Sequence, residues 1–129
     1  MGQEEIVNVG IACIKNEDSF LICQSGISKN FVWEFPGGKF LPGENLIDCV
    51  KREVNEELSI DVEVNPHFLE TESKTSDKTF RLYFCICRII SGIPELHEHL
   101  QYLWVPGVKL TDYKFHAANS SAIEMLKDL

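Results

Sequence analysis

The sequence has no long hydrophobic run and few basic residues. None of its apolar stretches approaches the roughly 20 residues of a membrane-spanning helix, and the N-terminus MGQEEIVNVG lacks the basic-then-apolar order of a signal peptide. We therefore expect a soluble, cytoplasmic protein without a membrane partner. Twelve Lys and Arg against 20 Asp and Glu give a formal net charge of −8. This balance argues against nonspecific binding to nucleic-acid polymers, which depends on many cationic contacts with phosphates.

Cysteine pairs with a recognisable chemistry are also missing. The five cysteines are odd in number, and they show neither zinc-ligand spacing nor a Cys-x-x-Cys redox pair. Cys85 and Cys87 alternate with Phe84 and Ile86 in an expected strand, so they share one face. We predict that the cysteines are buried and act as small hydrophobic side chains.

The chain of 129 residues, with 44% hydrophobic content, suits a single domain over residues 1–129. Hydrophobic periodicity predicts strands over residues 6–14, 19–24, 31–35, 62–73, 79–90 and 101–105. A helix is expected after Asn45 and another over residues 117–129, with an apolar stripe formed by Ala118, Ala122, Met125 and Leu126 or Leu129. The fold class indicated by this pattern is α+β.

An acidic cluster surrounds Arg52 between residues 38 and 60. Its members are Glu44, Asp48, Glu53, Glu56 and Glu57. Asn45 is a predicted helix N-cap, and in the helix that follows the last three carboxylates project within roughly a third of a turn of one another. Such close charges repel unless a cation lies between them, and oxygen ligands suit hard ions such as Mg²⁺ or Mn²⁺. A solvated acidic helix face is the alternative reading of the same residues.

The spacing around this cluster is long and specific. It consists of Gly38, five residues, Glu44, seven residues, Arg52-Glu53, an aliphatic residue, any residue, and Glu56-Glu57. This pattern resembles the Nudix box, and the preceding WEFPGGK of residues 33–39 resembles the MutT-like branch of the Nudix hydrolases. The resemblance implies a mixed β-sheet between helices, with a loop-helix-loop box. Ser59 departs from the pattern, which has Gly at this position, where Gly permits a left-handed C-cap that Ser adopts only at a steric cost.

The resemblance also implies roles for individual residues. It makes Glu53, Glu56 and Glu57 metal ligands, joined by a main-chain carbonyl of Gly37 or Gly38. Mg²⁺ is the implied cofactor, with Mn²⁺ as a substitute. Arg52 would orient the glutamates through hydrogen bonds, and Glu44 would be structural.

A further acidic residue outside the box is implied in the site. Glu98 resembles the loop glutamate that binds metal or deprotonates the attacking water, and Glu95 competes for that role. His97 and His99 flank Glu98, but they lack the His-Glu-x-x-His spacing of a zinc site. We expect both histidines at the surface.

Recognition of a base is expected at Asn119. The segment FHAAN of residues 115–119 resembles Phe-Pro-x-Ala-Asn, in which the Asn reads the base, while the alternative makes Asn119 a helix N-cap. An Asn amide offers a donor beside an acceptor, whereas guanine presents two acceptors, N7 and O6. Oxidation at C8 places a proton on N7, so Asn119 would select 8-oxo-guanine, although cytosine suits the same amide. Lys39 and Phe35 are further predicted substrate contacts, and Phe35 suits the core equally well.

Together with these residues, the resemblance implies a metal-dependent nucleoside triphosphate pyrophosphohydrolase that removes oxidised guanine nucleotides, with a monophosphate and pyrophosphate as products. A CTP or modified-cytosine pyrophosphohydrolase is the first alternative. A Nudix enzyme for dinucleoside polyphosphates or nucleotide sugars is the second, and a noncatalytic nucleotide-binding module is the third. The complete set of box carboxylates disfavours the third. No protein partner is predicted.

Overall fold

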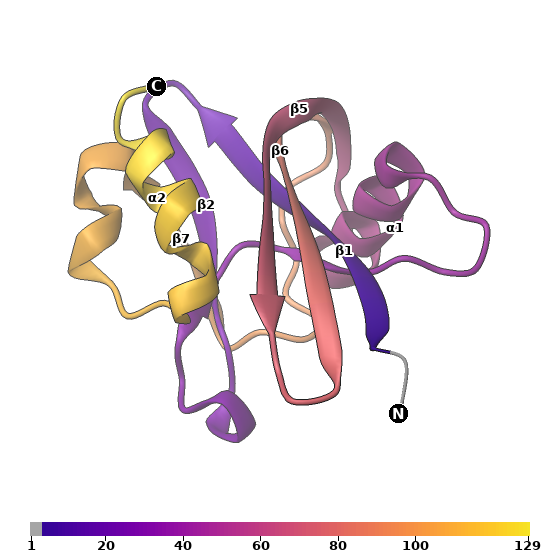
Figure 1. Cartoon of the computed structure of the whole chain (residues 1–129). Helices are drawn as coiled ribbons and strands as arrows, with labels where there is room; N and C mark the ends of the chain where they lie inside the picture. Colours follow the sequence, from indigo (N-terminus) through magenta and orange to yellow (C-terminus); the bar gives the residue numbers. More distant parts are fainter. Residues whose placement is uncertain (1–3) are drawn as a thin grey trace.

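The computed structural model describes residues 4–129 (Figure 1). The strands in this part of the chain are β1 (Glu5–Asn16), β2 (Ser19–Gln24), β3 (Trp33–Glu34), β4 (Gly37–Lys39), β5 (Asp61–Lys74), β6 (Lys78–Ser91) and β7 (Gln101–Pro106). The α-helices are α1 (Leu46–Leu58) and α2 (Ser120–Leu126), and the 3₁₀ helices are η1 (Ile27–Lys29), η2 (Gly107–Asp112) and η3 (Ala117–Asn119). Neither α-helix within residues 4–129 is long and apolar enough to cross a membrane.

Strand β1 lies at the centre of the mixed sheet. It runs parallel to β6 and antiparallel to β4, and β6 pairs with β5 in a long antiparallel hairpin. β2 pairs with β7 and β3, and meets β1 only at the turn, where Lys15 lies opposite Phe20 and Asn16 opposite Ser19. The β1–β2 hairpin therefore joins two halves of the sheet.

Alternation along β1 and β2 gives the molecule two cores. Ile11, Cys13, Phe20 and Ile22 pack toward α2, whereas Ala12, Ile14, Leu21 and Cys23 pack toward α1. The two helices accordingly lie on opposite sides of the strands, with α2 drawn in yellow (Figure 1). This arrangement confirms the predicted α+β fold with a sheet between helices.

Helix α1 forms where its predicted Asn45 cap places it, and an apolar stripe docks it on the core. The Asn45 Oδ1 accepts a hydrogen bond from the backbone N of Asp48 at 2.9 Å. Val50, Val54 and Leu58 are fully buried, and burial of each stabilises the docked helix by roughly 1.5–3 kcal/mol before entropy is counted. Glu53 and Glu57 are left along the edge of the helix that faces β4, whereas Asp48 bonds with Asn45 at the start of the helix.

The helix ends at Ser59 in the left-handed conformation, with φ 55°. The residue thus takes the geometry that Gly would adopt more cheaply. Its backbone N donates to Asn55 O at 2.8 Å, and its hydroxyl lies 2.6 Å from His97 Nε2. The Ser at this position therefore keeps the helix cap and adds a bond to a distant loop.

Two predicted elements differ from the structure. The strand expected over residues 31–35 shortens to Trp33–Glu34, because Asn30 and Phe31 both have positive φ and break the extended chain. The C-terminal helix begins with the 3₁₀ helix η3, which shifts its phase. Ala122, Ile123 and Leu126 are buried in α2, whereas Met125 is exposed. The predicted stripe is therefore confirmed at Ala122 and, of the alternatives Leu126 and Leu129, at Leu126, but it was wrong at Met125.

The cysteine prediction is confirmed. All five cysteines are free and buried. Burial raises the pKa of the Cys23 thiol to about 12, so a reactive thiolate does not form there near neutral pH.

Candidate active site

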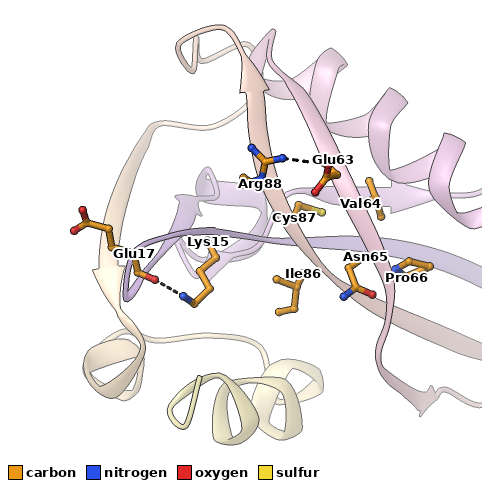
Figure 2. Close-up of a pocket in the computed structure, with 9 residues that line it drawn as sticks. All are labelled: Lys15, Glu17, Glu63, Val64, Asn65, Pro66, Ile86, Cys87 and Arg88. Atoms are coloured by element: carbon orange, nitrogen blue, oxygen red, sulfur yellow. Dashed lines mark hydrogen bonds and ion pairs between the residues drawn. The ribbon is translucent and has the colours of Figure 1, made fainter.

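One hollow on the described surface does not contain the predicted site residues. This cavity of about 600 Å³ lies between the end of β1 and the β5–β6 hairpin (Figure 2). Its cations are already paired, since Lys15 Nζ donates to Glu17 O and Arg88 Nη2 lies 3.1 Å from Glu63 Oε2. The acidic edge of α1 is therefore the stronger candidate for the site.

Two glycines let β4 lie directly against β1 and α1. A Cβ added at Gly37 would overlap the backbone O of Gly10. A Cβ added at Gly38 would lie 2.5 Å from both carboxylate oxygens of Glu53. The two glycines thus bring the β4 backbone beside the carboxylates of the helix, where the sequence predicts a main-chain ligand.

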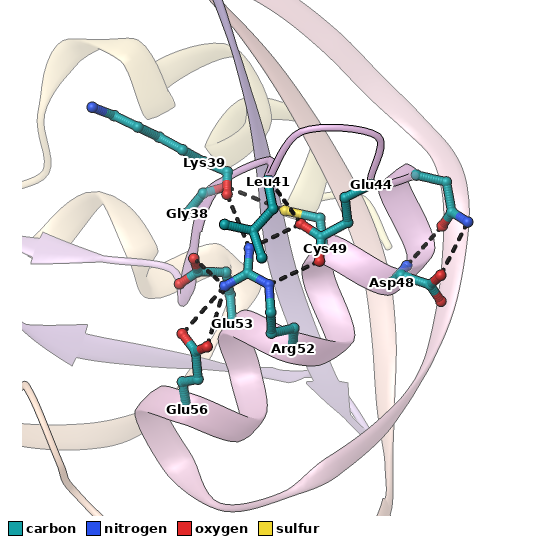
Figure 3. A network of polar contacts seen from close by, with 10 residues as sticks. Gly38, Lys39, Leu41, Glu44, Asp48, Cys49, Arg52, Glu53 and Glu56 are labelled. Carbon is teal, nitrogen blue, oxygen red and sulfur yellow. Dashed lines mark hydrogen bonds and ion pairs between the residues drawn. The ribbon is translucent and has the colours of Figure 1, made fainter.

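Arg52 organises the outer part of the acidic cluster (Figure 3). Its Nε and Nη2 donate to both oxygens of Glu44, at 2.8 and 2.9 Å. Nη1 donates to Glu53 Oε1 at 2.9 Å and to Glu56 Oε2 at 3.2 Å. Nη2 of the same guanidinium also donates to Lys39 O at 3.0 Å. One guanidinium therefore links α1, the loop before it and β4.

Glu44 faces the arginine rather than the open site. Besides Arg52, its carboxylate accepts the backbone N–H of Leu41 at 3.0 Å. The hydrogen bonds from Arg52 and Leu41 lower the pKa of Glu44 to about 2. This geometry is that of a bridge between the loop and the helix, as predicted for a structural residue.

Glu57 is the buried member of the cluster. Its side chain is 2% exposed and accepts the Gly37 N–H at 3.2 Å. Burial, followed by the neighbouring Glu53 and Glu98 carboxylates, raises the pKa of Glu57 to about 9. By contrast, the Glu56 side chain is 53% exposed. An anion in the position of Glu57 needs a positive partner that residues 4–129 do not supply within hydrogen-bond distance.

These surroundings fit a divalent cation. Within residues 4–129, no three His, Cys, Asp or Glu side chains already converge as a metal-binding group. The donors nearest one another are nevertheless carboxylate oxygens, the set that hard cations prefer. A cation bound beside Glu53 and Glu57 would replace the proton that burial otherwise imposes on Glu57.

The loop of residues 92–100 folds back over the end of α1 and brings Glu98 to the cluster. Three backbone bonds hold it, from Glu95 N to Leu58 O at 2.8 Å, from His97 N to Glu57 O at 3.3 Å and from Leu100 N to Gln24 O at 3.0 Å. The charge of Glu98 acts on Glu57, whereas the Glu95 carboxylate lies 3.8 Å from His97 Nε2. The effect of the Glu98 charge on Glu57 therefore favours Glu98 over Glu95 as the loop residue of the site.

The two histidines of this loop have different environments. His97 is exposed, as predicted, but the His99 side chain is only 4% exposed. Its Nε2 lies 2.8 Å from Glu34 Oε2 and 3.9 Å from Glu57 Oε1. The prediction of a surface position for His99 was wrong, because its burial depends on the loop closing over α1.

A smaller cavity, of about 400 Å³, lies beside Glu34. It is lined by Lys29, Asn30, Val32, Trp33, Glu34, His116 and Asn119. Asn119 is 9% exposed, and its Nδ2 donates to His116 O at 3.2 Å. It makes no side-chain capping bond to α2; the cap of the preceding 3₁₀ helix is His116 Nδ1, which accepts from Ala118 N at 3.0 Å. The interpretation of Asn119 as a side-chain cap of α2 is therefore wrong.

The other predicted substrate contacts lie outside this cavity. Phe35 is 4% exposed and stacks on Phe115, with ring centroids 5.3 Å apart; it belongs to the core rather than to a base-stacking surface. Trp33 lines the cavity instead. The Lys39 side chain is exposed and points away from the Arg52 network (Figure 3).

Sequence reasoning missed Glu34 and Lys29 as residues of the cavity. Glu34 lies 3.4 Å from Lys29 Nζ and 2.8 Å from His99 Nε2. Burial opposes its ionisation, but the His99 hydrogen bond and the charge of Lys29 outweigh burial and lower the pKa of Glu34. An acidic residue between Trp33 and Phe35, in an otherwise apolar segment, was the available signal.

Comparison with known proteins adds four findings. The model of the NUDIX domain matches residues 5–129. An 8-oxo-dGTP diphosphatase of Buchnera aphidicola subsp. Acyrthosiphon pisum is 37% identical over 102 residues, which cover 79% of this chain and 82% of that protein. The CTP pyrophosphohydrolase of Escherichia coli K12 is 25% identical over 122 residues, or 93% and 90% of the two chains. The crystal structure of a MutT protein from Methanosarcina mazei Go1 matches with a TM-score of 0.85 at 23% identity, over 99% of this chain and 97% of that one.

Proposed function

The chain belongs to the NUDIX family and is a Nudix hydrolase, and on that premise we propose that it is a Mg²⁺-dependent pyrophosphohydrolase of oxidised guanine nucleoside triphosphates. The observation that supports the metal site best is the burial of Glu57 beside Glu53 and Glu98. The diphosphatase relative at 37% identity supports the substrate.

The metal would be held by Glu53, Glu56, Glu57 and Glu98, with a backbone carbonyl of Gly37 or Gly38. A bound divalent cation neutralises charge on phosphate oxygens and lowers the pKa of water, and Mn²⁺ would substitute for Mg²⁺. Arg52 fixes the Glu53 and Glu56 side chains through Nη1, which limits the freedom that metal binding would otherwise have to remove. Glu98 either completes the ligand set or accepts the proton of the attacking water.

The nucleoside would occupy the cavity of Trp33, Glu34 and Asn119. The aromatic face of Trp33 suits base stacking. The Asn119 amide already donates to His116 O, so its Oδ1 is the group that would accept N7–H of 8-oxo-guanine while a second Nδ2 hydrogen reaches O6. Lys39, at the exposed end of β4, would contact the phosphates.

The test is a nucleotide panel assayed by pyrophosphate release with and without Mg²⁺. We expect the highest kcat/KM for 8-oxo-dGTP and no turnover in EDTA. Equal kcat/KM for dGTP and 8-oxo-dGTP would contradict the substrate, and metal-independent turnover would contradict the site. Reaction in ¹⁸O-labelled water should place the label in pyrophosphate, because we propose that water attacks the β-phosphorus and the nucleoside monophosphate leaves.

A CTP or modified-cytosine nucleotide is the second candidate. It is favoured by the CTP pyrophosphohydrolase relative, which aligns with 93% of this chain. The cytosine edge, with its N4 amino donor and N3 acceptor, also pairs with an Asn amide. The same panel decides between the two, since a cytosine enzyme should prefer CTP or 5-substituted dCTP over both guanine nucleotides.

A further inference from the structure

His99 is buried between two carboxylates that belong to different parts of the site. Glu34 comes from β3 and lines the 400 Å³ cavity. Glu57 comes from α1 and is the buried member of the acidic cluster. The His99 Nε2 lies 2.8 Å from the first and 3.9 Å from the second. One imidazole nitrogen therefore lies between a carboxylate of the cavity and a carboxylate of the acidic cluster.

The hydrogen bonds of His99 fix its orientation. Ionised carboxylates only accept hydrogen bonds, so Nε2 must carry the proton that it shares with Glu34. The other ring nitrogen, Nδ1, is buried and has no hydrogen-bond partner within residues 4–129. An unpaired buried polar atom costs roughly 1–3 kcal/mol, and an apolar side chain of similar size would avoid that cost. The presence of an imidazole here is thus unfavourable for packing and calls for another reason.

The backbone around His99 is rigidly placed. His97 N donates to Glu57 O at 3.3 Å, and Leu100 N donates to Gln24 O at 3.0 Å, so the residue is flanked by two anchors. Gln24 itself faces Trp33 across the β2–β3 pair. The ring is therefore held between the helix of the acidic cluster and the strand that borders the cavity.

We propose that His99 is a positioning residue that couples the nucleoside cavity to the metal carboxylates, by holding Glu34 in place and limiting the movement of Glu57. The inference rests on the proposed function, in which Glu57 binds a divalent cation. Removing a side chain that hydrogen-bonds a metal ligand typically changes metal affinity or activity by roughly 10–100-fold. His99 Nε2 lies 3.9 Å from Glu57 Oε1, longer than a hydrogen bond, so we expect an effect at the lower end of that range. In this proposal His99 does not act on the substrate itself, because its side chain is only 4% exposed and lies between the two carboxylates.

The first test compares His99→Leu with His99→Gln. Leucine fills the space without a donor, whereas the glutamine amide nitrogen reaches the position of Nε2 and can donate to Glu34. We expect His99→Leu to weaken Mn²⁺ binding, measured by electron paramagnetic resonance without nucleotide, by about tenfold or more, and to raise KM. His99→Gln should restore most of both. His97→Gln is the matched control, because that exposed side chain contacts Ser59 and Glu95 instead.

The second test asks whether the coupling passes through His99. Glu34→Gln changes a residue that is not a proposed metal ligand, yet it should alter Mn²⁺ affinity severalfold in the wild-type background. In the His99→Leu background the same change should have no further effect, which is the non-additivity expected of residues in one network. Additive effects, or wild-type Mn²⁺ affinity in His99→Leu, would overturn the inference.

These outcomes separate the inference from the proposed function. Absence of Mn²⁺ binding by the wild-type protein would overturn the proposed metal site itself. Binding by the wild-type protein with unchanged affinity and KM in both His99 variants would overturn only the coupling. If His99→Leu fails to fold, judged by its melting temperature, Glu34→Gln in the wild-type background still decides, because the proposed coupling requires this change to shift Mn²⁺ affinity and an unchanged affinity would overturn it.

Discussion

Glu56 and Glu57 are neighbours in the chain with opposite surroundings. The Glu56 side chain is 53% exposed and bonded to Arg52, whereas Glu57 is 2% exposed and bonded to the Gly37 N–H. Function and stability therefore make different demands on Glu57. Its charge is what a metal needs, and the same charge is unfavourable in a metal-free protein.

The Glu57→Gln variant should separate these two demands. A carboxamide keeps the shape but loses the anionic oxygen, so turnover should fall at least a hundredfold, and Glu53→Gln should behave alike.

In metal-free buffer Glu57→Gln should melt higher than wild type. The folded-state pKa of about 9 lies above the ordinary value of 4.5, so wild type loses stability as pH rises through this interval, and Gln does not. Activity assays and melting curves at pH 5 and pH 8 check both. Turnover near wild type in both variants would refute the assigned ligands.

Asn119→Ala tests base reading at a single side chain. The variant should lose selectivity between its preferred nucleotide and dGTP by one to two orders of magnitude, because a buried hydrogen-bond pair distinguishes them. Turnover at saturating substrate should stay within severalfold of wild type, since Asn119 is not one of the proposed metal ligands. The ratio of kcat/KM values measures the effect. An unchanged ratio would remove Asn119 from the site.

Ser59 offers a third test, on backbone strain. Ser59→Ala keeps the left-handed conformation at φ 55° and loses the hydroxyl bond to His97, whereas Ser59→Gly loses the bond but relieves the strain. Left-handed geometry costs an L-residue roughly 1–2 kcal/mol. We therefore expect Ser59→Gly to be about 1 kcal/mol more stable than Ser59→Ala in urea unfolding. Equal stabilities would mean that the αL geometry at Ser59 carries no strain.

At the scale of elements, local and distant contacts differ in how far the sequence predicts them. Helix α1 was predictable, because Asn45, its apolar stripe and its acidic edge lie within one segment. The same holds for the β5–β6 hairpin. The burial of His99 was not, because it depends on Glu34, 65 positions earlier, and on a loop that closes over the end of α1. The phase of α2 was missed for a local reason, the 3₁₀ turn at Ala117–Asn119.

The link between the box loop and α1 should be pH-sensitive. The Arg52 hydrogen bonds lower the folded-state pKa of Glu44 to about 2, below its ordinary value of 4.5. The stability that this pair contributes is therefore complete above pH 4.5 and is lost as pH falls toward 2. Urea unfolding should show a smaller loss between pH 4.5 and pH 3 in Glu44→Gln than in wild type. Arg52→Lys should resemble Glu44→Gln, because Lys cannot bind both carboxylate oxygens; a full wild-type slope in both variants would contradict this link.

At the scale of the whole molecule, the β1–β2 hairpin carries the proposed metal site on one side and the proposed nucleoside cavity on the other. One side of the sheet packs on α1, whose edge presents the carboxylates, and the other packs on α2, whose preceding turn presents Asn119. The cavity and the acidic cluster meet where β3, β4 and the loop of residues 92–100 come together. The acidic cluster can therefore change with α1, and the cavity can change with α2. The contact between Glu34 and His99 joins the cluster to the cavity.

The net charge of −8 attracts any cation to the surface of this protein. Stabilisation by a metal ion at a specific site must therefore be distinguished from stabilisation by charge screening. If Mg²⁺ binds at Glu53 and Glu57, a concentration of 100 times Kd stabilises the fold by about 2.7 kcal/mol, or roughly 10 °C in melting temperature for a domain of this size. NaCl at the same ionic strength should give a much smaller rise, because it screens charges without occupying the site. Glu57→Gln should lose the Mg²⁺-specific part and keep the salt-dependent part. Equal shifts from the two salts in wild type would mean that the acidic edge of α1 attracts cations without binding one, and would remove the basis for metal-dependent hydrolysis.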